Sequence, residues 1–283
     1  MSALPDLRGK VAVITGGASG IGKGTARQLI AEGMRVVIAD IEADALEKTA
    51  DEIGAVGVPT DVSDLDSVRA LARSVTDRFG AVHVVVNNAG IGPVARIADL
   101  AIEDWHWMIG VNLYGVIHGV HVFLPLLKAN DDGGHIVNTA SIFGLFANPP
   151  LGAYAVSKYG VVALTEALAA ELEQENSKVG ATVLCPATVR TNVSTSTRNR
   201  PRRYAGGALS DFELSEEESQ TYRWLTPEEA GAVVVGAIRN GDLYAFTHAE
   251  WYPAIERRHQ AIAAAFRRTA DREARGAEAP GGR

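Results

Sequence analysis

The fold is decided by one stretch near the N-terminus, Val11-Ala12-Val13-Ile14-Thr15-Gly16-Gly17-Ala18-Ser19-Gly20-Ile21-Gly22. Its first residues form an apolar run typical of a strand buried on both faces, and the glycines follow without a connecting loop. Glycine lets the backbone turn sharply, and a helix that starts at such a turn offers free N–H groups to an anion. The stretch predicts a strand, a turn and a helix that bind the pyrophosphate of a dinucleotide. A tight strand–helix packing turn of the same composition is the alternative.

Short apolar runs alternate with helical patterns along most of the chain. Strands are predicted at Val11–Thr15, Arg35–Ala39, Val56–Thr60, Val82–Asn87, His135–Thr139, Ala181–Cys185 and Tyr244–Thr247. Helices are predicted over residues 21–32, 42–53, 64–79, 103–128, 154–175 and 227–239. This order predicts an α/β fold, a doubly wound parallel sheet of the Rossmann-like kind, with ligands at the carboxyl ends of its strands.

Two segments interrupt this alternation. Residues 192–223 are rich in Ser, Thr, Arg and Gly and are too long for a plain connector, which indicates a substrate lid or insertion. Residues 270–283 end in Glu-Ala-Pro-Gly-Gly-Arg and are predicted to be a disordered tail. Residues 1–269 are therefore predicted to form a single domain that includes the lid.

Composition excludes several classes of partner. The formal net charge of −7 disfavours binding to nucleic acid or to an anionic membrane. The single cysteine, Cys185, cannot form an internal disulfide, and no Cys/His cluster has zinc spacing, so no metal is expected. The N-terminus lacks the pattern of a signal peptide, and no apolar stretch is expected to be long enough to span a bilayer. The expected location is the cytoplasm.

Asp40, at the end of the second predicted strand, favours NAD over NADP. A carboxylate there accepts hydrogen bonds from both adenosine ribose hydroxyls and repels a 2′-phosphate. Ile41 follows where an arginine would neutralise that phosphate, and Ser19 is uncharged. Lys23 is the nearby cation, which leaves a minor NADP activity open. Alternatively, Asp40 caps the helix that begins near Ile41.

Several further motifs follow the strands in order. The spacing Gly16, Gly20, Gly22 departs from the usual G-x-G-x-x-G turn. Later motifs are Asp61-Val62, Asn87-Asn88-Ala89-Gly90, Asn112 in mid-helix, Ser141, Tyr154 with Lys158, and Pro186-Ala187-Thr188-Val189-Arg190-Thr191. Over about residues 8–195 and the final strand, the chain resembles the short-chain dehydrogenase/reductase family. Ala187 replaces the glycine that the family usually has at this position, so the backbone around Ala187 can differ from that of the family.

The resemblance implies a set of residues that bind NAD. Asp61 and Val62 correspond to the pair that contacts adenine, the motif ending at Gly90 supports the sheet and lines the cofactor, and the segment from Pro186 holds the nicotinamide. The complete set of expected cofactor-binding residues is Gly16, Ser19, Gly20, Ile21, Gly22, Asp40, Ile41, Asp61, Val62, Asn88, Ala89, Gly90, Tyr154, Lys158, Pro186, Val189 and Thr191.

Four residues are the candidate catalytic groups: Asn112, Ser141, Tyr154 and Lys158. Tyr154 and Lys158 are four apart and project from one helix face. A tyrosine titrates near pH 10, but a nearby ammonium and the positive nicotinamide lower that pKa, so Tyr154 can exchange a proton with the substrate during hydride transfer. Ser141 is expected to hold the substrate oxygen. Lys158 is also expected to bind the nicotinamide ribose, and Asn112 to hold a water that passes protons onward.

The predicted function is an NAD-dependent oxidoreductase that moves a hydride between nicotinamide and the carbon of a secondary alcohol or ketone. Phe143, Leu145 and Phe146 give the pocket an apolar rim, and residues 109–201 show a looser resemblance to family members that oxidise benzylic alcohols of lignin-derived aryl ethers. A bulky aromatic or alicyclic alcohol is therefore expected, with a 3-oxoacyl or hydroxysteroid substrate as the alternative. A non-catalytic NAD(H) sensor on the same fold is the alternative from another class.

A homodimer or homotetramer is also predicted. The helices over 103–128 and 154–175 carry apolar faces that include Trp105, Val120, Phe123, Leu164 and Leu168. In the family these helices pair across a two-fold axis. The alternative is that the faces cover the sheet.

Overall fold

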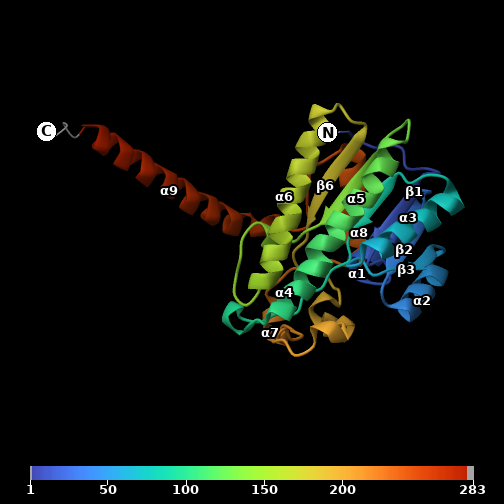
Figure 1. The fold of residues 1–283 in the computed structure, drawn as a ribbon, viewed down its shortest axis with the longest axis horizontal. Coiled ribbons are helices and arrows are strands. Elements are labelled where there is room, and N and C mark those ends of the chain that lie inside the picture. Colours follow the sequence, from blue (N-terminus) through green and yellow to red (C-terminus); the bar gives the residue numbers. More distant parts are fainter. Residues whose placement is uncertain (1, 279–283) are drawn as a thin grey trace. The chain divides into compact units, whose positions relative to one another are not determined.

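The computed structural model describes residues 2–278. Its centre is a seven-stranded sheet in which all neighbouring strands are parallel, in the order β3-β2-β1-β4-β5-β6-β7 (Figure 1). The strands are β1 (Val11–Thr15), β2 (Arg35–Asp40), β3 (Val56–Pro59), β4 (Val84–Asn87), β5 (Gly134–Thr139), β6 (Val179–Cys185) and β7 (Tyr244–Phe246). The predicted doubly wound parallel sheet is confirmed.

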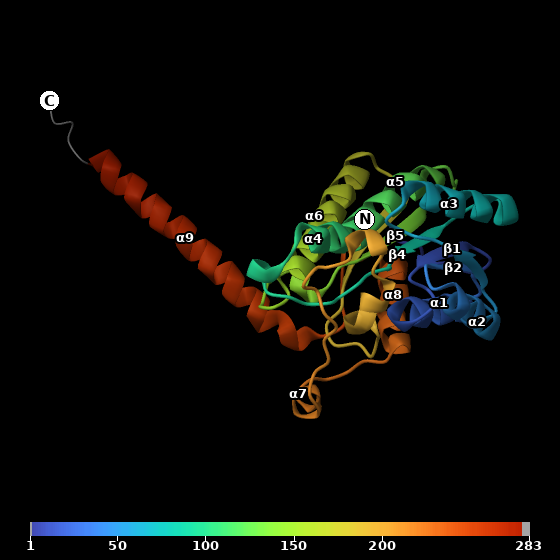
Figure 2. The same ribbon diagram turned by 60° about the horizontal axis from the view of Figure 1, so that its bottom comes forward.

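Helices cover both faces of this sheet. Figure 2 shows α1, α2 and α8 on one face and α3, α5 and α6 on the other. The helices are α1 (Gly20–Ala31), α2 (Ala43–Ile53), α3 (Leu65–Phe79), α4 (Ile102–Ile109), α5 (Gly115–Lys128), α6 (Gly152–Gln174), α7 (Glu216–Gln220), α8 (Pro227–Asn240) and α9 (Tyr252–Glu278). Because both faces are covered, β4 is buried along its whole length, as its unbroken run of valines predicts.

The strand register brings the candidate site residues to one edge of the sheet. Thr15 at the end of β1 pairs with Ala39 of β2, and Asn87 at the end of β4 pairs with Asn138 of β5. The carboxyl ends of these strands therefore align. The strand order reverses between β1 and β4, and in such sheets the ligand crevice lies at this reversal.

A buried polar network fixes α6 against the sheet below the site. The Asn87 side chain donates to Oδ1 of Asn138 at 2.8 Å, and the Asn138 side chain donates to Oγ1 of Thr165 at 3.0 Å. These bonds join β4, β5 and α6 in register, and Tyr154 and Lys158 lie on the first two turns of that helix. Hydrogen-bonded amides in a dry core specify geometry, because any other packing leaves them unpaired.

The single helix predicted over 103–128 is interrupted. Between α4 and α5 the chain forms a π-helical turn, Gly110–Tyr114, with Asn112 at its centre. Such turns occur mostly as single insertions in α-helices and often mark functional sites. The region 102–128 is also long and apolar enough to cross a membrane by length and composition, which corrects the prediction that no such stretch exists. One side of it packs in the core, with Phe123 and Leu127 fully buried, whereas Ile102 and Tyr114 are exposed.

The C-terminal prediction is also corrected. Helix α9 runs to Glu278, so residues 270–278 are helical, and 279–283 lie outside the described residues. The segment 267–278 is rich in Arg, Ala and Glu, which are strong helix formers even without burial. The compact unit that contains the sheet ends at Thr247, and residues 248–278 belong to a second unit, whereas the sequence predicted one domain over residues 1–269.

Candidate active site

The glycine-rich turn forms a cradle at the start of α1. Gly16 and Gly20 have positive φ values of 66° and 51°, a conformation that favours glycine, and a Cβ on Gly22 would collide with the carbonyl of Gly16. Ser19 is the N-cap residue, but among the described residues its side chain makes no capping bond and instead donates to Asn192 at 3.2 Å. The first turn of α1 carries no acidic residue. These features suit a bound pyrophosphate.

Thr15 joins this turn to the Asn-Asn-Ala-Gly motif. Its Oγ1 accepts hydrogen bonds from the backbone N–H of Asn88 at 3.0 Å and of Ala89 at 3.1 Å, and the Asn88 side chain donates to the Thr15 carbonyl at 3.0 Å. The two strand ends at the sheet reversal are thus held together. The sequence prediction did not include Thr15 among the site residues. A hydroxyl residue at the end of an otherwise apolar strand could have indicated this role.

Asp40 orders the glycine turn from the neighbouring strand. Its carboxylate accepts from the N–H of Ala18 and from the N–H of Glu42, both at 3.1 Å. Burial raises the pKa of this carboxyl, and those backbone hydrogen bonds oppose the rise. The carboxylate therefore supports the glycine turn, a role that the sequence prediction did not include. Ile41 beside it is exposed.

The structure brings a second cation close to this end of the site. Arg198 pairs with Glu42 at 2.6 Å, and the hydrogen bond from Arg198 is the main reason that the pKa of Glu42 is lowered. Sequence analysis named only Lys23 here, and Lys23 pairs with Glu52 at 2.7 Å. Arg198 lies far along the chain, in the segment 192–223, so only folding brings it beside Glu42.

Asp61 and Val62 follow β3 at the same edge. The Asp61 carboxylate accepts from the N–H of Ser63 at 2.9 Å and from its hydroxyl at 2.7 Å, which closes a tight turn. Val62 is almost fully buried, and its carbonyl lies 2.9 Å from Nδ1 of His118. The turn therefore has a fixed backbone at the position expected for adenine.

Tyr154, Lys158 and Ser141 converge between α6 and the end of β5. The Nζ of Lys158 lies 5.6 Å from the centroid of the Tyr154 ring and donates to the carbonyl of Thr139 at 2.9 Å. Ser141 and Tyr154 share a hydrogen bond. Lys158 is only 3% exposed, and burial lowers its pKa to about 8. The structure therefore brings Tyr154, Lys158 and Ser141 together, as the sequence predicted.

The protein groups alone raise the pKa of Tyr154, whereas the lowering expected from sequence includes the charge of a bound nicotinamide. Burial raises this pKa above its ordinary value, and the hydrogen bond from Ser141 only partly offsets the rise. The protein groups around Tyr154 do not by themselves favour its phenolate, because desolvation disfavours the charged form. The lowering expected from sequence thus depends on the charge of the nicotinamide in addition to that of Lys158.

Asn112 holds the loop after β4 through both of its amide atoms. Its Oδ1 accepts from the N–H of Ile91 at 2.8 Å, and its Nδ2 donates to the Ile91 carbonyl at 2.9 Å and to Oγ of Ser157 at 3.1 Å. Asn112 is fully buried in the π turn. A Cβ on Gly90 would lie 3.3 Å from Asn112 Oδ1 and 3.5 Å from Lys158 Nζ, so glycine keeps the space before the lysine open.

The segment after β6 closes the other side of the site. The carbonyl of Pro186 accepts from the N–H of Ile142, and the N–H of Ala187 donates to Thr247. In the described part of the chain, Asn176 is the one non-glycine residue with positive φ, so Ala187 is accommodated without strain. Val189 packs against Ile21 of α1.

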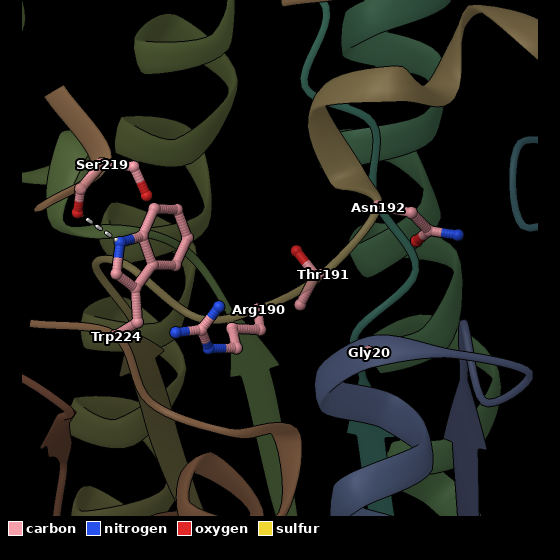
Figure 3. A pocket seen from close by; sticks show the side chains of 6 residues that line it. All are labelled: Gly20, Arg190, Thr191, Asn192, Ser219 and Trp224. Carbon is pink, nitrogen blue, oxygen red and sulfur yellow. Dashed lines mark hydrogen bonds between the residues drawn. The ribbon is translucent and has the colours of Figure 1, made fainter. Parts of the chain in front are cut away.

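A pocket of about 500 Å³ opens beside Thr191, the last residue of this motif. Figure 3 shows Gly20 and Asn192 on one side of it and Arg190 directed toward Trp224 on the other. The Arg190 guanidinium lies 5.9 Å from the centroid of the Trp224 ring. The pocket therefore lies between the glycine turn and the segment 192–223.

The first part of that segment is folded. It contains 3₁₀ turns at Val193–Asn199 and Arg202–Tyr204, and the N–H of Gly92 donates to the carbonyl of Val193 at 2.9 Å. Leu209 is buried, although the composition of the segment suggested little to bury. Among the described residues, no group of three His, Cys, Asp or Glu side chains is placed to hold a metal ion.

Comparisons with known proteins agree with this architecture. The family described as short chain dehydrogenase matches residues 10–202. A C alpha-dehydrogenase of Sphingobium sp. (strain NBRC 103272 / SYK-6) is 30% identical over 267 residues, which cover 92% of this chain and 87% of that protein. A cyclohexanol dehydrogenase of Acinetobacter sp. (strain SE19) is 40% identical over 176 residues, or 60% of this chain and 70% of that protein. The crystal structure of a short chain dehydrogenase/reductase from Burkholderia phymatum in complex with NAD superposes with a TM-score of 0.84, at 36% identity and over 92% and 96% of the two chains.

The strand order and the glycine turn at the sheet reversal define a Rossmann-like nucleotide-binding oxidoreductase fold. The chain belongs to the short-chain dehydrogenase/reductase family, as its resemblance predicted, and is an oxidoreductase acting on alcohols or ketones.

Proposed function

We propose that this chain is an NAD-dependent dehydrogenase of bulky, apolar secondary alcohols, with Tyr154 as its acid/base. The observation that carries the proposal is the convergence of Tyr154, Lys158 and Ser141, with the Lys158 ammonium 5.6 Å from the Tyr154 ring centroid. The glycine turn is compatible with a dinucleotide, because Cβ atoms at Gly16 or Gly22 would collide with the backbone of Ala89 or of Gly16, so glycine is needed for this tight turn at the start of α1. The bound nicotinamide supplies the hydride acceptor.

The protein groups divide the remaining work. Ser141 donates to the substrate oxygen and holds it against Tyr154, and the Oη of Tyr154 takes the alcohol proton as the C–H bond breaks. Lys158 stabilises the phenolate form of Tyr154, which accepts this proton and becomes the neutral phenol, and Lys158 also binds the nicotinamide ribose. Asn112 acts on the loop through Ile91, and its position near Gly90 suits a water that carries the proton away from Lys158.

NAD is the proposed cofactor because Asp40 lies at the end of β2, where a carboxylate is expected to bind the adenosine ribose, and because Arg198 is already paired with Glu42. A bulky substrate is supported by apolar side chains around Tyr154, which packs against a cluster containing Ile91, Trp107 and Met108. The names of two relatives, a C alpha-dehydrogenase and a cyclohexanol dehydrogenase, also favour a secondary alcohol of this kind.

Replacement of Tyr154 by phenylalanine tests the proposal directly. Tyr154→Phe removes only the hydroxyl, so the variant should fold, bind NADH as the wild type does, and lose at least about 100-fold in kcat for 1-phenylethanol, within the range usual for proton-transfer groups. Tyr114→Phe makes the same change at an exposed side chain and is the matched control. Retention of more than about a tenth of kcat by Tyr154→Phe would rule out Tyr154 as the acid/base.

We also propose a homodimer or homotetramer, on a revised set of residues. Phe123 and Leu168 are buried against the sheet of their own chain, so they do not form an outer face. Ile102, Tyr114 and Val156 are instead exposed, on α4, the π turn and α6. Sedimentation at micromolar concentration should give a mass of at least twice 29.9 kDa, and a single species at 29.9 kDa would contradict the proposal.

A further inference from the structure

Asp104 is a fully buried carboxylate that serves two distant segments. Its Oδ2 accepts from the N–H of Ala101 at 3.0 Å, which caps the start of α4. The same carboxylate accepts from the N–H of Ala208 at 2.8 Å and of Leu209 at 3.4 Å. A helix cap needs only the first of these bonds and normally lies at the surface. The others attach the backbone of the segment 192–223 to α4.

Arg200 supplies the opposite charge from within the same segment. Its guanidinium pairs with Asp104 at 2.6 Å, lies 5.2 Å from the centroid of the Trp107 ring and donates from Nε to the carbonyl of Tyr204 at 2.5 Å. Gly207 lies directly against this ion pair, and a Cβ there would collide with both side chains. A buried ion pair adds little net stability by comparison with apolar residues of similar size. The role of this pair is therefore to position the backbone of the segment 192–223 against α4.

The bonds to Asp104 determine where Leu209 lies. Leu209 is 6% exposed and packs in one cluster with Trp107, Met108 and Ala153, against which the ring of Tyr154 also packs. The next residue, Ser210, forms a two-way backbone bridge with Val94, in the loop after β4. Leu209 and Tyr154 therefore belong to one apolar cluster, which makes Leu209 a candidate wall of a substrate site at the proposed acid/base.

We propose that Asp104, paired with Arg200, is a positioning residue that fixes Leu209 as the substrate-pocket wall and so sets the size of alcohol that the site accepts. This inference rests on the proposed function, because the wall matters only if the alcohol binds at Tyr154. An alcohol with large substituents contacts the wall, whereas a small alcohol reaches Tyr154 without using it. Loss of the Asp104 charge frees the backbone of residues 204–210 and affects the large substrate selectively.

The test compares 1-phenylethanol with 2-propanol in Asp104→Asn, which keeps the shape of the side chain and one acceptor oxygen. KM for 1-phenylethanol should rise about tenfold, a change of the size that pocket contacts give, while KM for 2-propanol and the Kd for NADH stay within about threefold. Leu209→Ala, which leaves the ion pair intact, should give the same selective rise. Arg202→Gln removes an exposed arginine of the same segment and should change neither KM.

Hydrogen exchange provides a readout that needs no turnover. The amides of Ala208 and Leu209 should exchange at least about tenfold faster in Asp104→Asn than in the wild type, because the opening free energy of a segment sets its exchange rate. Equal exchange, or an equal rise of both KM values, would overturn the inference. A wild type that oxidises neither alcohol with NAD⁺ would contradict the proposed function instead, and the exchange result would still decide whether Asp104 holds the segment.

Discussion

Replacement of Lys158 by methionine should stabilise the fold while abolishing activity. Lys158 is buried, and burial lowers its pKa to about 8. An unfolded lysine titrates near 10.4, and each pKa unit corresponds to about 1.4 kcal/mol, so the buried charge costs about 3 kcal/mol at pH 7. Loss of the hydrogen bond to Thr139 offsets about 1 kcal/mol of the gain. Lys158→Met should therefore be more stable by about 2 kcal/mol, or ~4–8 °C in Tm for a chain of this size.

The stability gain should depend on pH in a defined direction. The pKa of Lys158 is lower in the folded chain than in the unfolded chain, so between about pH 8 and 10.4 the unfolded chain binds the additional proton. The unfolding free energy contributed by Lys158 consequently rises with pH in that window, and wild type and variant should converge near pH ~10.

Thermal unfolding of both proteins from pH 7 to 10 measures this difference. Lys178→Met, the same change at an exposed lysine, controls for the loss of a surface charge and should give a small offset at every pH. A variant that is less stable than the wild type at pH 7, or a gap that stays constant with pH, would refute the reasoning from burial.

Three further predictions concern the cofactor and the segment 192–223. Asp40→Asn removes the negative charge but keeps an acceptor oxygen for the N–H of Ala18. The ratio of kcat/KM for NAD to kcat/KM for NADP should therefore fall by about tenfold, equivalent to about 1.4 kcal/mol. A wild type that prefers NADP would contradict the assignment of NAD. Gly90→Ala places a Cβ 3.3 Å from Asn112 Oδ1 and should weaken NADH binding in a fluorescence titration; an unchanged Kd would contradict the assignment of Gly90 to the cofactor site. Residues 213–223 should exchange their amide hydrogens faster than residues 193–212. Exchange in residues 213–223 should become slower when NADH and an unreactive substrate analogue bind. Equal protection with and without these ligands would indicate that the segment is a plain insertion.

The parts of the fold that the sequence predicted are those whose signals are local. Each strand is a short apolar run next to a turn, and α8 begins as predicted, with Thr226 and Glu229 forming a capping box. The glycine turn, the Asn-Asn-Ala-Gly motif and the Tyr154–Lys158 pair were also recognisable, because their chemistry depends on close spacing along one element.

The features that sequence analysis missed depend on contacts between distant residues. Asp104 looks like an ordinary acidic residue in the first turn of a helix, and its pairing with Arg200 across about a hundred residues is not visible in any window. The π turn around Asn112 was missed because one extra residue hardly changes a helical apolar pattern. The rise that burial causes in the pKa of Tyr154 was not predicted, because burial depends on the whole fold, and the predicted lowering with bound NAD⁺ stays a prediction.

The buried polar contacts also connect the two ends of the site. Asn112 fixes the backbone of Ile91, and the next residue, Gly92, donates to Val193 and to Ser196 at the start of the segment 192–223. Val94 then forms a backbone bridge with Ser210, beside the bonds to Asp104.

The loop after β4 thus lies between the proposed nicotinamide position on one side and the proposed substrate wall on the other. Because the Asn112 amide in the π turn holds this loop in addition to the apolar packing of Ile91, a shift of Asn112 would move both surfaces together. Substitution at Asn112 should accordingly change cofactor affinity and alcohol KM in parallel, whereas substitution at Asp104 should change only the latter.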